Sequence, residues 1–444
     1  MDAFVIQGGN RLKGRLRVNG SKNASLPLMA ATLLTDQPVH IKGVPRLADI
    51  ANLRRLLAEL GVSQGELASN ESGVDVSFRA DDPSKVHAPY DIVRTMRASI
   101  CVLGPLLAKR GQARVSMPGG CAFGDRPVDL HLRGLRALGA HITLEQGDIV
   151  ARAPVSGRLR GARVFLGGPF GSTVLGTANV MSAATLAEGV TIIECAACEP
   201  EVVDLANLLN AMGAHVRGAG TPRVVIEGVK ELHGATHEVI ADRIEAGTYM
   251  MAAAITNGNL TLENVPMDAL MALQDVFETI GVHIKPVEGR DSNPMAMTVE
   301  VSSDRVLRPA QVTTQPHPGF PTDLQAQTMA LLTLAHGNSV ITERIYQERF
   351  LHVAELSRMG AQIFRQGPTV VVSGVRELVG APVMASDLRA SASLILAGLA
   401  ASGRTIVRRV YHLDRGYEKM ETRLKALGAD IARVDDRELP AGDE

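Results

Sequence analysis

One loop of the chain surrounds a cysteine with residues that tune a thiol. The segment PGGCAFGDR, residues 118–126, sets Cys121 among glycines, with Arg126 close behind and a helix expected to follow. Glycine-rich loops are flexible, and a neighbouring cation together with a helix N-terminus lowers the pKa of a thiol. Cys121 on such a lid is a candidate acid, base or nucleophile, whereas Cys101, inside an apolar helical pattern, suits an inert buried role.

Cations also stand where the sequence predicts helices to begin. Lys22, Arg97, Arg126 and Arg389 lie at or just before such positions, where a positive charge opposes the helix dipole. For any one of them a surface ion pair is the simpler interpretation. The set as a whole favours an anionic ligand, because helix N-termini and cations together bind anions. Other charged residues share these loops: Glu199, Glu201, Asp242, Asp323, Arg349, Asp387 and Arg415.

Composition and motifs argue against several common functions. Lys plus Arg number 46, Asp plus Glu number 47, and aromatic residues are 3% with no Trp, which disfavours nucleic acid and anionic membranes as partners. There is no GxGxxG loop, no HExxH and only one CxxC pair, Cys195 and Cys198, so nucleoside triphosphate and metal chemistry are not expected. The few cysteines, and the lack of a long apolar run or signal-peptide pattern, predict a cytoplasmic protein with reduced thiols.

The elements that would position these residues form a sixfold repeat. A helical pattern that ends in a hydrophobic residue, Gly and Ala or Val recurs about every 70 residues, and each glycine suits a helix C-terminal cap. A second, more apolar helix comes earlier in every repeat, with short β-rich stretches around the helices. The shared glycines are 61, 139, 213, 281, 360 and 428, and the apolar helices are predicted at 22–34, 92–111, 175–189, 244–258, 323–337 and 387–403.

Repeats this small cannot each bury two helices, so they must pack together. Grouping them three and three predicts two similar α/β domains, residues 22–240 and residues 1–21 with 241–434, followed by a frayed acidic tail at 435–444. A single ring of six repeats is the alternative. In a two-domain protein the ligand is expected in the cleft between the domains. The polar stretches 63–73 and 288–295 are predicted to be turns between strands.

Seven segments together resemble one enzyme family. They match the enolpyruvyl transferases that act on UDP-N-acetylglucosamine in peptidoglycan synthesis, and the resemblance extends from the first residues to about residue 432. The segments are GSKNA (20–24), RTMRASI (94–100), PGGCAFGDRPVDLH (118–131), EPEVVD (199–204), FPTDLQAQ (320–327), DLRASAS (387–393) and HLDRGYE (412–418).

The resemblance implies a fold and a reaction. The fold is two domains, each an inside-out α/β barrel of three βαβαββ repeats, with the active site in the cleft between them. The reaction moves the enolpyruvyl group of phosphoenolpyruvate to the 3-hydroxyl of the sugar by addition and elimination, releasing phosphate. No metal or other cofactor is implied, and the partners are these two small molecules. The epoxide antibiotic fosfomycin is expected to alkylate Cys121.

The resemblance also assigns roles to individual residues. Cys121 matches the acid that protonates C3 of phosphoenolpyruvate, and Asp323 matches the group that takes the sugar hydroxyl proton. Lys22, Arg126, Arg389 and Arg415 would bind the phosphate and carboxylate, with Lys22 and Arg415 counted among the catalytic residues, and Asn23 would lie by the intermediate. Further substrate-binding residues by resemblance are Arg97, Pro127, Val128, Asp129, Leu130, Thr173, Val174, Ile345, Arg349 and Asp387.

Two alternatives remain open at this point. A shikimate-3-phosphate enolpyruvyl transferase would have the same fold, although the cysteine lid argues against it. A catalytically silent UDP-sugar-binding protein would need neither Cys121 nor Asp323. The chain also departs from the common family pattern at Cys101, Asp125, Cys198 and the long segment 167–179.

Overall fold

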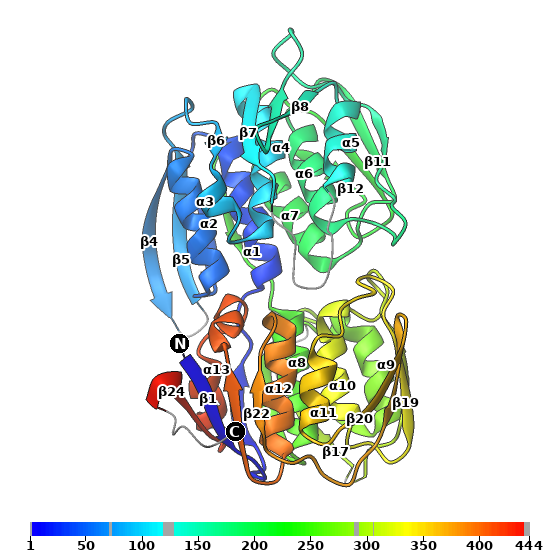
Figure 1. Ribbon diagram of the computed structural model, residues 1–444. Helices are drawn as coiled ribbons and strands as arrows, with labels where there is room; N and C mark the ends of the chain where they lie inside the picture. Colours follow the sequence, from blue (N-terminus) through cyan, green and yellow to red (C-terminus); the bar gives the residue numbers. More distant parts are fainter. Residues whose placement is uncertain (1, 71–72, 119–127, 288–292, 305, 439–444) are drawn as a thin grey trace. The chain divides into compact units, whose positions relative to one another are not determined.

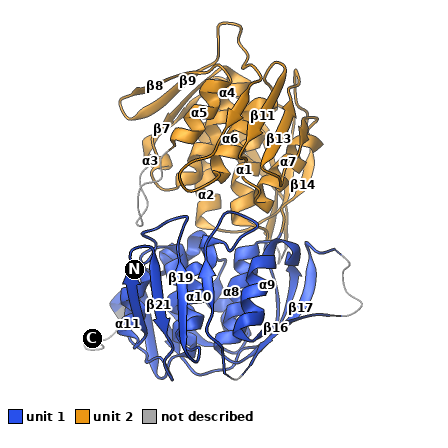
Figure 2. Ribbon diagram, turned by 90° about the vertical axis from the view of Figure 1, so that its right-hand side faces the viewer, with its two compact units in different colours: residues 1–19, 122–124, 241–444 blue, residues 20–121, 125–240 orange. Residues whose placement is uncertain are grey.

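The chain folds into two compact units, described by a computed structural model over residues 2–70, 73–118, 128–287, 293–304 and 306–438. The N-terminal unit covers residues 20–240, leaving aside the undescribed segment 119–127. The C-terminal unit joins Met1–Asn19 to Ala241–Glu444 (Figure 2). Each unit has its own hydrophobic core, so each is a folding domain in the ordinary sense.

The described strands form six four-stranded sheets, one for each repeat (Figure 1). In the N-terminal unit the sheet orders are β14-β3-β5-β4, β6-β7-β9-β8 and β10-β11-β13-β12. The strands are β3 (Val39–Val44), β4 (Val62–Asn70), β5 (Gly73–Ala80), β6 (His87–Ala88), β7 (Gln112–Ser116), β8 (His141–Glu145), β9 (Asp148–Arg152), β10 (Arg163–Phe165), β11 (Val190–Glu194), β12 (His215–Arg217), β13 (Arg223–Glu227) and β14 (Thr236–Glu238).

The C-terminal unit has the same pattern, with sheet orders β16-β17-β15-β2, β18-β19-β21-β20 and β22-β23-β1-β24. Its strands are β1 (Asp2–Gln7), β2 (Lys13–Arg17), β15 (Asn259–Val265), β16 (Val282–Pro286), β17 (Met297–Ser303), β18 (Gln311–Thr313), β19 (Asn338–Thr342), β20 (Gln362–Gln366), β21 (Thr369–Ser373), β22 (Pro382–Met384), β23 (Arg404–Arg408) and β24 (Asp430–Asp435).

Both units are closed by strands from distant parts of the chain. In the N-terminal unit, β14 pairs in parallel with β3 and supplies the first strand of the first repeat. In the C-terminal unit, β2 pairs in parallel with β15, and β1 lies between β23 and β24. Each unit therefore consists of three complete βαβαββ repeats, which is the predicted fold class.

Three apolar helices pack together inside each unit. In the N-terminal unit these are α1 (Lys22–Ala31), α4 (Leu103–Arg110) and α6 (Val174–Ala184); in the C-terminal unit they are α8 (Arg243–Ile255), α10 (Gln325–Leu332) and α12 (Leu388–Ala400). Nearly all residues of α8 and α12 are buried, as their all-round hydrophobicity predicts. The sheets and second helices surround these central helices (Figure 1).

The second helices carry the glycine signature of the repeat. They are α2 (Ala48–Glu59), α5 (Asp129–Ala137), α7 (Pro200–Ala211), α9 (Met271–Ile280), α11 (His352–Arg358) and α13 (Met420–Ala426). The six shared glycines all have positive φ, between 77° at Gly61 and 98° at Gly428. The predicted C-terminal caps are therefore confirmed, because this backbone conformation strains any residue with a Cβ atom.

The structure corrects one predicted helix, at 92–111. It is broken into α3 (Tyr90–Val93), the 3-10 helix η2 (Arg97–Val102) and α4, with Met96 extended at φ −149°. Pro105 lies in the first turn of α4, where proline is tolerated but where it favours a fresh helix start over continuation of an earlier one.

Two predicted loops also need correction. The polar stretch 63–73 is largely strand β4, which pairs with β5 at the edge of its sheet and exposes both faces near its end, so its polarity does not mark a turn. Of the predicted frayed tail, Asp435 ends β24 and Asp436–Glu438 form the 3-10 helix η6, where Asp436 accepts a hydrogen bond from Arg408 Nε at 2.8 Å. Residues 288–292 and 439–444 lie outside the described residues.

Candidate active site

A carboxylate bound by two buried arginines stands out in the C-terminal unit. Asp323, in the 3-10 helix η4 (Thr322–Leu324) that leads into α10, accepts hydrogen bonds from Arg389 Nη2 and Arg349 Nη1, both at 2.9 Å. The two arginine side chains are 4% and 6% exposed, whereas that of Asp323 is 26% exposed. The arrangement keeps a carboxylate with access to solvent in the ionised form, which can accept a proton.

Arg389 is held by the start of its own helix and by an aromatic ring. Asp387 caps α12, accepting hydrogen bonds from the backbone N–H groups of Arg389 at 2.9 Å and Ala390 at 3.2 Å. The guanidinium carbon lies 5.5 Å from the centre of the Tyr417 ring. Burial by itself would lower the pKa of Arg389, but the charge of Asp323, together with Tyr417, Asp242 and the hydrogen bond to Asp323, raises it above its ordinary value.

A second polar network is hydrogen-bonded to this cluster. Gln327, in α10, donates to the carbonyl of Asp323 at 2.9 Å and to the Tyr417 hydroxyl at 3.1 Å. The Tyr417 hydroxyl is also 2.8 Å from that of Thr248, in α8. All three side chains are buried. The central helices α8 and α10 are thus connected through the residue that stacks on Arg389.

The predicted sugar contact Ile345 lies on a loop that follows β19. Its backbone N–H donates to Glu343 Oε1 at 2.8 Å, and Glu343 Oε2 accepts from the Thr322 hydroxyl at 2.9 Å. Arg415 ends the 3-10 helix η5 (Val410–Arg415), which packs on α12. The pKa of neighbouring His412 is lowered by burial and by the charge of Arg415.

In the N-terminal unit, Lys22 is the first residue of α1. Its Nζ lies 3.2 Å from Oδ2 of Asp49, a buried residue in the first turn of α2. Ser21 caps α1 by accepting a hydrogen bond from the N–H of Ala24 at 3.2 Å, and the partly buried Asn23 follows Lys22. The carboxylate of Asp49, in the same repeat, thus compensates the positive charge that Lys22 places at the N-terminus of α1, so this charge needs no ligand to explain it.

Arg97 is the first residue of η2, and its charge contributes to lowering the pKa of the buried His131. Burial, and then the charge of Arg97, lower the pKa of His131 to about 3, so this imidazole is neutral at physiological pH. Asn179, in α6, joins three neighbouring elements: its side chain lies 2.9 Å from His131 Nδ1, donates to the Ile100 carbonyl at 2.8 Å and accepts from the Gly104 N–H at 2.7 Å.

The remaining predicted residues of this unit lie at helix starts or outside the described residues. Thr173 caps α6, with its hydroxyl accepting from the Gly176 N–H at 3.2 Å, and Val174 is the first residue of that helix. Val128 is buried at the start of α5, followed by exposed Asp129 and half-buried Leu130. Cys121, Arg126 and Pro127, which carry the predicted acid and part of the anion site, are not among the described residues.

The described cysteines are all free thiols. Burial raises the pKa of Cys101 to about 12, which fits the inert role predicted for it. Burial also raises the pKa of Cys198, with further contributions from Glu199 and Cys195. Within the described ranges there is no group of three or more His, Cys, Asp or Glu residues that could hold a metal ion, and no helix is long and apolar enough to cross a membrane.

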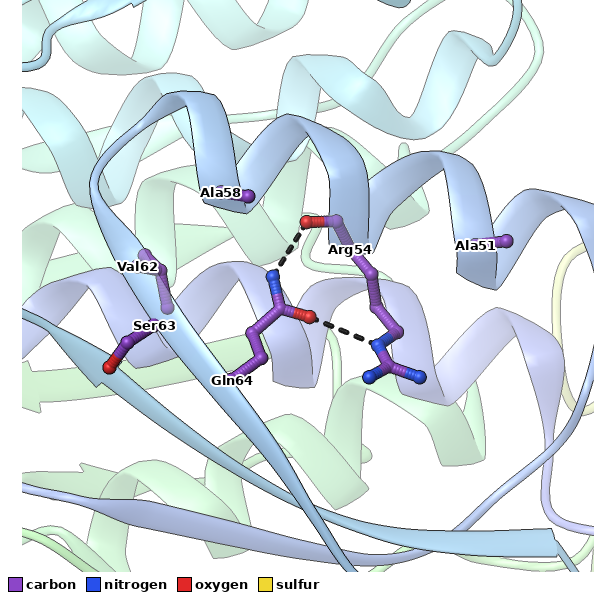
Figure 3. A pocket seen from close by; sticks show the side chains of 6 residues that line it. All are labelled: Ala51, Arg54, Ala58, Val62, Ser63 and Gln64. Carbon is purple, nitrogen blue, oxygen red and sulfur yellow. Dashed lines mark hydrogen bonds between the residues drawn. The ribbon is translucent and has the colours of Figure 1, made fainter.

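A hollow on the surface of the N-terminal unit is lined by none of the predicted site residues. It is lined by α2 and the start of β4, where Arg54 and Gln64 hydrogen bond to each other at 2.6 and 3.0 Å (Figure 3). Its other lining residues are Ala51, Ala58, Val62 and Ser63, which offer no further charge, so the hollow gives no reason to move the site there.

The structure brings some of the predicted residues into direct contact and adds partners. Asp323 bonds to both Arg349 and Arg389, and Asp387 caps the helix that begins beside them. Sequence reasoning missed Asp49, Thr322, Glu343, Gln327 and Tyr417. Asp49 resembles an ordinary first-turn acid and Glu343 an ordinary charged loop residue, so neither carries a local signal of its buried role.

Comparison with known proteins identifies the family. The sequence matches the family model described as EPSP synthase (3-phosphoshikimate 1-carboxyvinyltransferase) over residues 6–424. The crystal structure of the enolpyruvyl transferase NikO from Streptomyces tendae matches with a TM-score of 0.85 and 25% identity, covering 98% of this chain and 99% of that one. An EPSP synthase from Acinetobacter baumannii, at 19% identity, has the same fold with a TM-score of 0.75 over 98% of this chain and all of that one, 100%.

The chain therefore belongs to the EPSP synthase family of enolpyruvyl transferases, and it is an enzyme of this carboxyvinyl-transferring class. Two relatives within the family are much more similar in sequence. UDP-N-acetylglucosamine 1-carboxyvinyltransferases of Magnetococcus marinus and Granulibacter bethesdensis are 51% and 52% identical over 434 residues, which cover 98% of this chain and 100% of each relative.

Proposed function

We propose that the protein transfers the enolpyruvyl group of phosphoenolpyruvate to the 3-hydroxyl of UDP-N-acetylglucosamine and releases phosphate. The observation that carries the proposal is the identity of about half of all residues, over nearly the full length, with relatives named for this activity. The EPSP synthases of Acinetobacter baumannii have under half that identity, so they support only a common fold. The product places the enzyme in peptidoglycan synthesis.

The proposed mechanism uses an acid and a base in turn. Asp323 takes the proton of the sugar hydroxyl as the hydroxyl oxygen bonds to C2 of phosphoenolpyruvate. At the same time Cys121 delivers a proton to C3. The Cys121 thiolate then takes one proton back from C3, the electron pair of that C–H bond restores the vinyl group as the bond from C2 to the phosphate oxygen breaks, and the phosphate leaves with the proton that Asp323 holds. The exposed edge of Asp323 and its clamp by Arg349 and Arg389 support the base role, because that carboxylate is fixed and ionised.

The cations of both units serve the anionic substrate in this proposal. Lys22, Arg126, Arg389 and Arg415 bind the phosphate and carboxylate of phosphoenolpyruvate, and Asn23 lies by the tetrahedral intermediate. The UDP-sugar is held by Arg97, residues 126–130, Thr173, Val174 and Ile345, with Arg349 and Asp387 fixing the loops around Asp323. The free thiols of Cys101, Cys195 and Cys198 suit the cytoplasm, where these substrates would be met.

A phosphate-release assay tests the function. Phosphate should appear when phosphoenolpyruvate and UDP-N-acetylglucosamine are both present, and neither substrate alone should support release. Shikimate 3-phosphate in place of the UDP-sugar should give none. Release only with shikimate 3-phosphate would support the first alternative, and no release with either acceptor would support a silent binding protein. The same assay after dialysis against a chelator tests the predicted independence from metals.

A further inference from the structure

One buried carboxylate behind the Asp323 cluster has no role in the mechanism above. Glu343, which directly follows β19, is fully buried. Its Oε1 accepts hydrogen bonds from the Thr314 hydroxyl at 2.6 Å and from the backbone N–H groups of Ile345 and Tyr346 at 2.8 and 2.9 Å. Its Oε2 accepts from the Thr322 hydroxyl at 2.9 Å. In all four contacts the carboxylate oxygens of Glu343 are the hydrogen-bond acceptors.

Thr322 connects this carboxylate to the arginine that binds Asp323. The Arg349 Nη1 group carries two hydrogens, and it lies 2.9 Å from both Thr322 Oγ1 and Asp323 Oδ1. The Thr322 hydroxyl has one hydrogen, which is donated to Glu343, so its lone pairs are left to accept from Arg349. Glu343 therefore sets the direction of a chain of hydrogen bonds from Arg349 through Thr322.

We propose that Thr322 and Glu343 are positioning residues for the base Asp323, an inference that rests on the proposed function. The Thr322 hydroxyl holds one hydrogen of Arg349 Nη1 and thereby aims the other at Asp323 Oδ1. Glu343 fixes that hydroxyl and, through the N–H groups of Ile345 and Tyr346, also fixes the loop of the predicted sugar contact. The buried carboxylate of Glu343 thus fixes both the orientation of the base Asp323 and the position of the loop that would contact the acceptor sugar.

Isosteric variants separate this role from a merely structural one. Thr322→Val keeps the shape but has no hydroxyl, whereas Thr322→Ser keeps the hydroxyl. We expect Thr322→Val to lower kcat about tenfold with the KM for phosphoenolpyruvate unchanged, the scale of one hydrogen bond to a charged group. Thr322→Ser should restore kcat to near the wild-type value. Glu343→Gln should lower kcat and also raise the KM for UDP-N-acetylglucosamine, because it disturbs the Ile345 loop as well.

The pH profile gives a readout that a loss of stability would not move. A loosened Arg349 stabilises the Asp323 carboxylate less, so the acid limb of kcat should shift to higher pH in Thr322→Val and Glu343→Gln and stay in place in Thr322→Ser. The other charged or titratable groups that the described residues place near the cluster include Asp242, Glu343, Tyr346, His352, Asp387, Arg389 and Tyr417, and none of them is substituted in the two Thr322 variants.

A measurement without turnover keeps this inference distinct from the proposed function. Full-length protein labelled with 13C at aspartate carboxyl carbons should show one resonance that Asp323→Asn removes, and its pKa should rise in Thr322→Val but not in Thr322→Ser. If Thr322→Val does not fold, Thr322→Ala is the second variant without a hydroxyl. An unchanged Asp323 titration in a folded variant without the hydroxyl would overturn the proposal, whatever substrate the enzyme uses.

Discussion

The two units share one repeat but place different chemistry around the starts of their helices. In the C-terminal unit, charges meet directly: Asp323 before α10 binds Arg389 of α12 and Arg349 before α11. In the N-terminal unit, the neutral amide of Asn179 joins α6 to η2, α4 and His131 of α5. The repeat thus fixes where helices begin, whereas the chemistry at those positions is particular to each unit.

Two histidines at equivalent places sharpen the comparison. His131 and His352 each stand eight residues before the shared glycine of their repeat, Gly139 and Gly360. Both are buried, and burial lowers their pKa values, to about 3 and about 4. Next to burial, the charge of Arg97 lowers the first pKa further, whereas the charge of Asp387 partly offsets burial at the second. A shared scaffold position therefore has different electrostatic surroundings in the two units.

The largest expected effect concerns the charged cluster of the C-terminal unit. Asp323→Asn should lower turnover by about a thousandfold, because the base can no longer accept a proton, while UDP-N-acetylglucosamine still binds in calorimetry. Asp304→Asn, the same change at an exposed ion pair with His283, is the matched control and should leave turnover unchanged. A defect confined to substrate affinity would show that Asp323 is not the base.

Removing the acid predicted in the N-terminal unit, Cys121, should lower turnover almost as strongly. Cys121→Ala should lower turnover by about a hundredfold, whereas Cys121→Asp should keep an acid, retain turnover and resist fosfomycin. Peptide mass spectrometry of the wild-type protein should find fosfomycin on Cys121, faster with UDP-sugar present. Cys101, buried with a pKa of about 12, is the internal control. Modification of another cysteine instead of Cys121 would contradict the assignment.

Lys22 allows folding and function to be separated in the N-terminal unit. Lys22→Ala should lower turnover by about a hundredfold and also cost about 3 kcal/mol of stability, because Asp49 would be left buried without that charge. The double variant Lys22→Ala with Asp49→Asn should recover most of the stability but not the turnover. Urea unfolding and the phosphate assay measure the two quantities. Recovery of turnover in the double variant would mean that Lys22 serves only the fold.

The lowered pKa of His352 predicts that the stability of the C-terminal unit depends on pH. The unfolded chain binds a proton on this imidazole near pH 6.5, whereas the folded chain does so only near its lowered pKa of about 4. Stability should therefore fall as the pH drops from 6.5 towards 4, by about 3 kcal/mol for this group. His352→Gln should flatten the pH dependence in urea unfolding, and exposed His336→Gln should not. Equal slopes in all three proteins would refute the prediction.

The smallest effect tests the feature that both units share. Gly360 has φ +91° with open space around it, so Gly360→Ala should cost about 1 kcal/mol through backbone strain alone. Gly65, in β4, also has open space but no positive φ, and Gly65→Ala should be close to neutral. Thermal unfolding compares the two. An equal cost at both positions would show that the cap conformation is not what the repeat glycine provides.

The sequence predicts the repeat well because its signals are local. The six cap glycines and strands such as β3, β11 and β19 lie where composition and spacing place them. The edge strand β4 escapes such reasoning, because an exposed strand needs no apolar alternation. The break between α3 and η2 escapes it too, since a run of apolar residues suits either one helix or several.

The sequence likewise predicts one part of the candidate site and misses another. The positions of Asp323, Arg349 and Arg389 in the sequence mark them as unusual, and the family resemblance gives their roles. Their contact with one another depends on which helix starts meet in three dimensions, 66 residues apart for Asp323 and Arg389. Glu343 carries no unusual sequence signal, and Thr322 stands out only as part of the segment FPTDLQAQ, because the proposed role of both comes from the partners that folding brings to them.

The crossed strands β1 and β2 have a consequence for synthesis of the chain. Both are synthesised long before their partners, because β2 must wait for β15 and β1 for β23 and β24, more than 200 and about 400 residues later. The N-terminal unit, closed by β14, can complete its sheets in the meantime. Two strands therefore remain without their native partners while those residues are synthesised, and strands in that state favour premature pairing between neighbouring nascent chains.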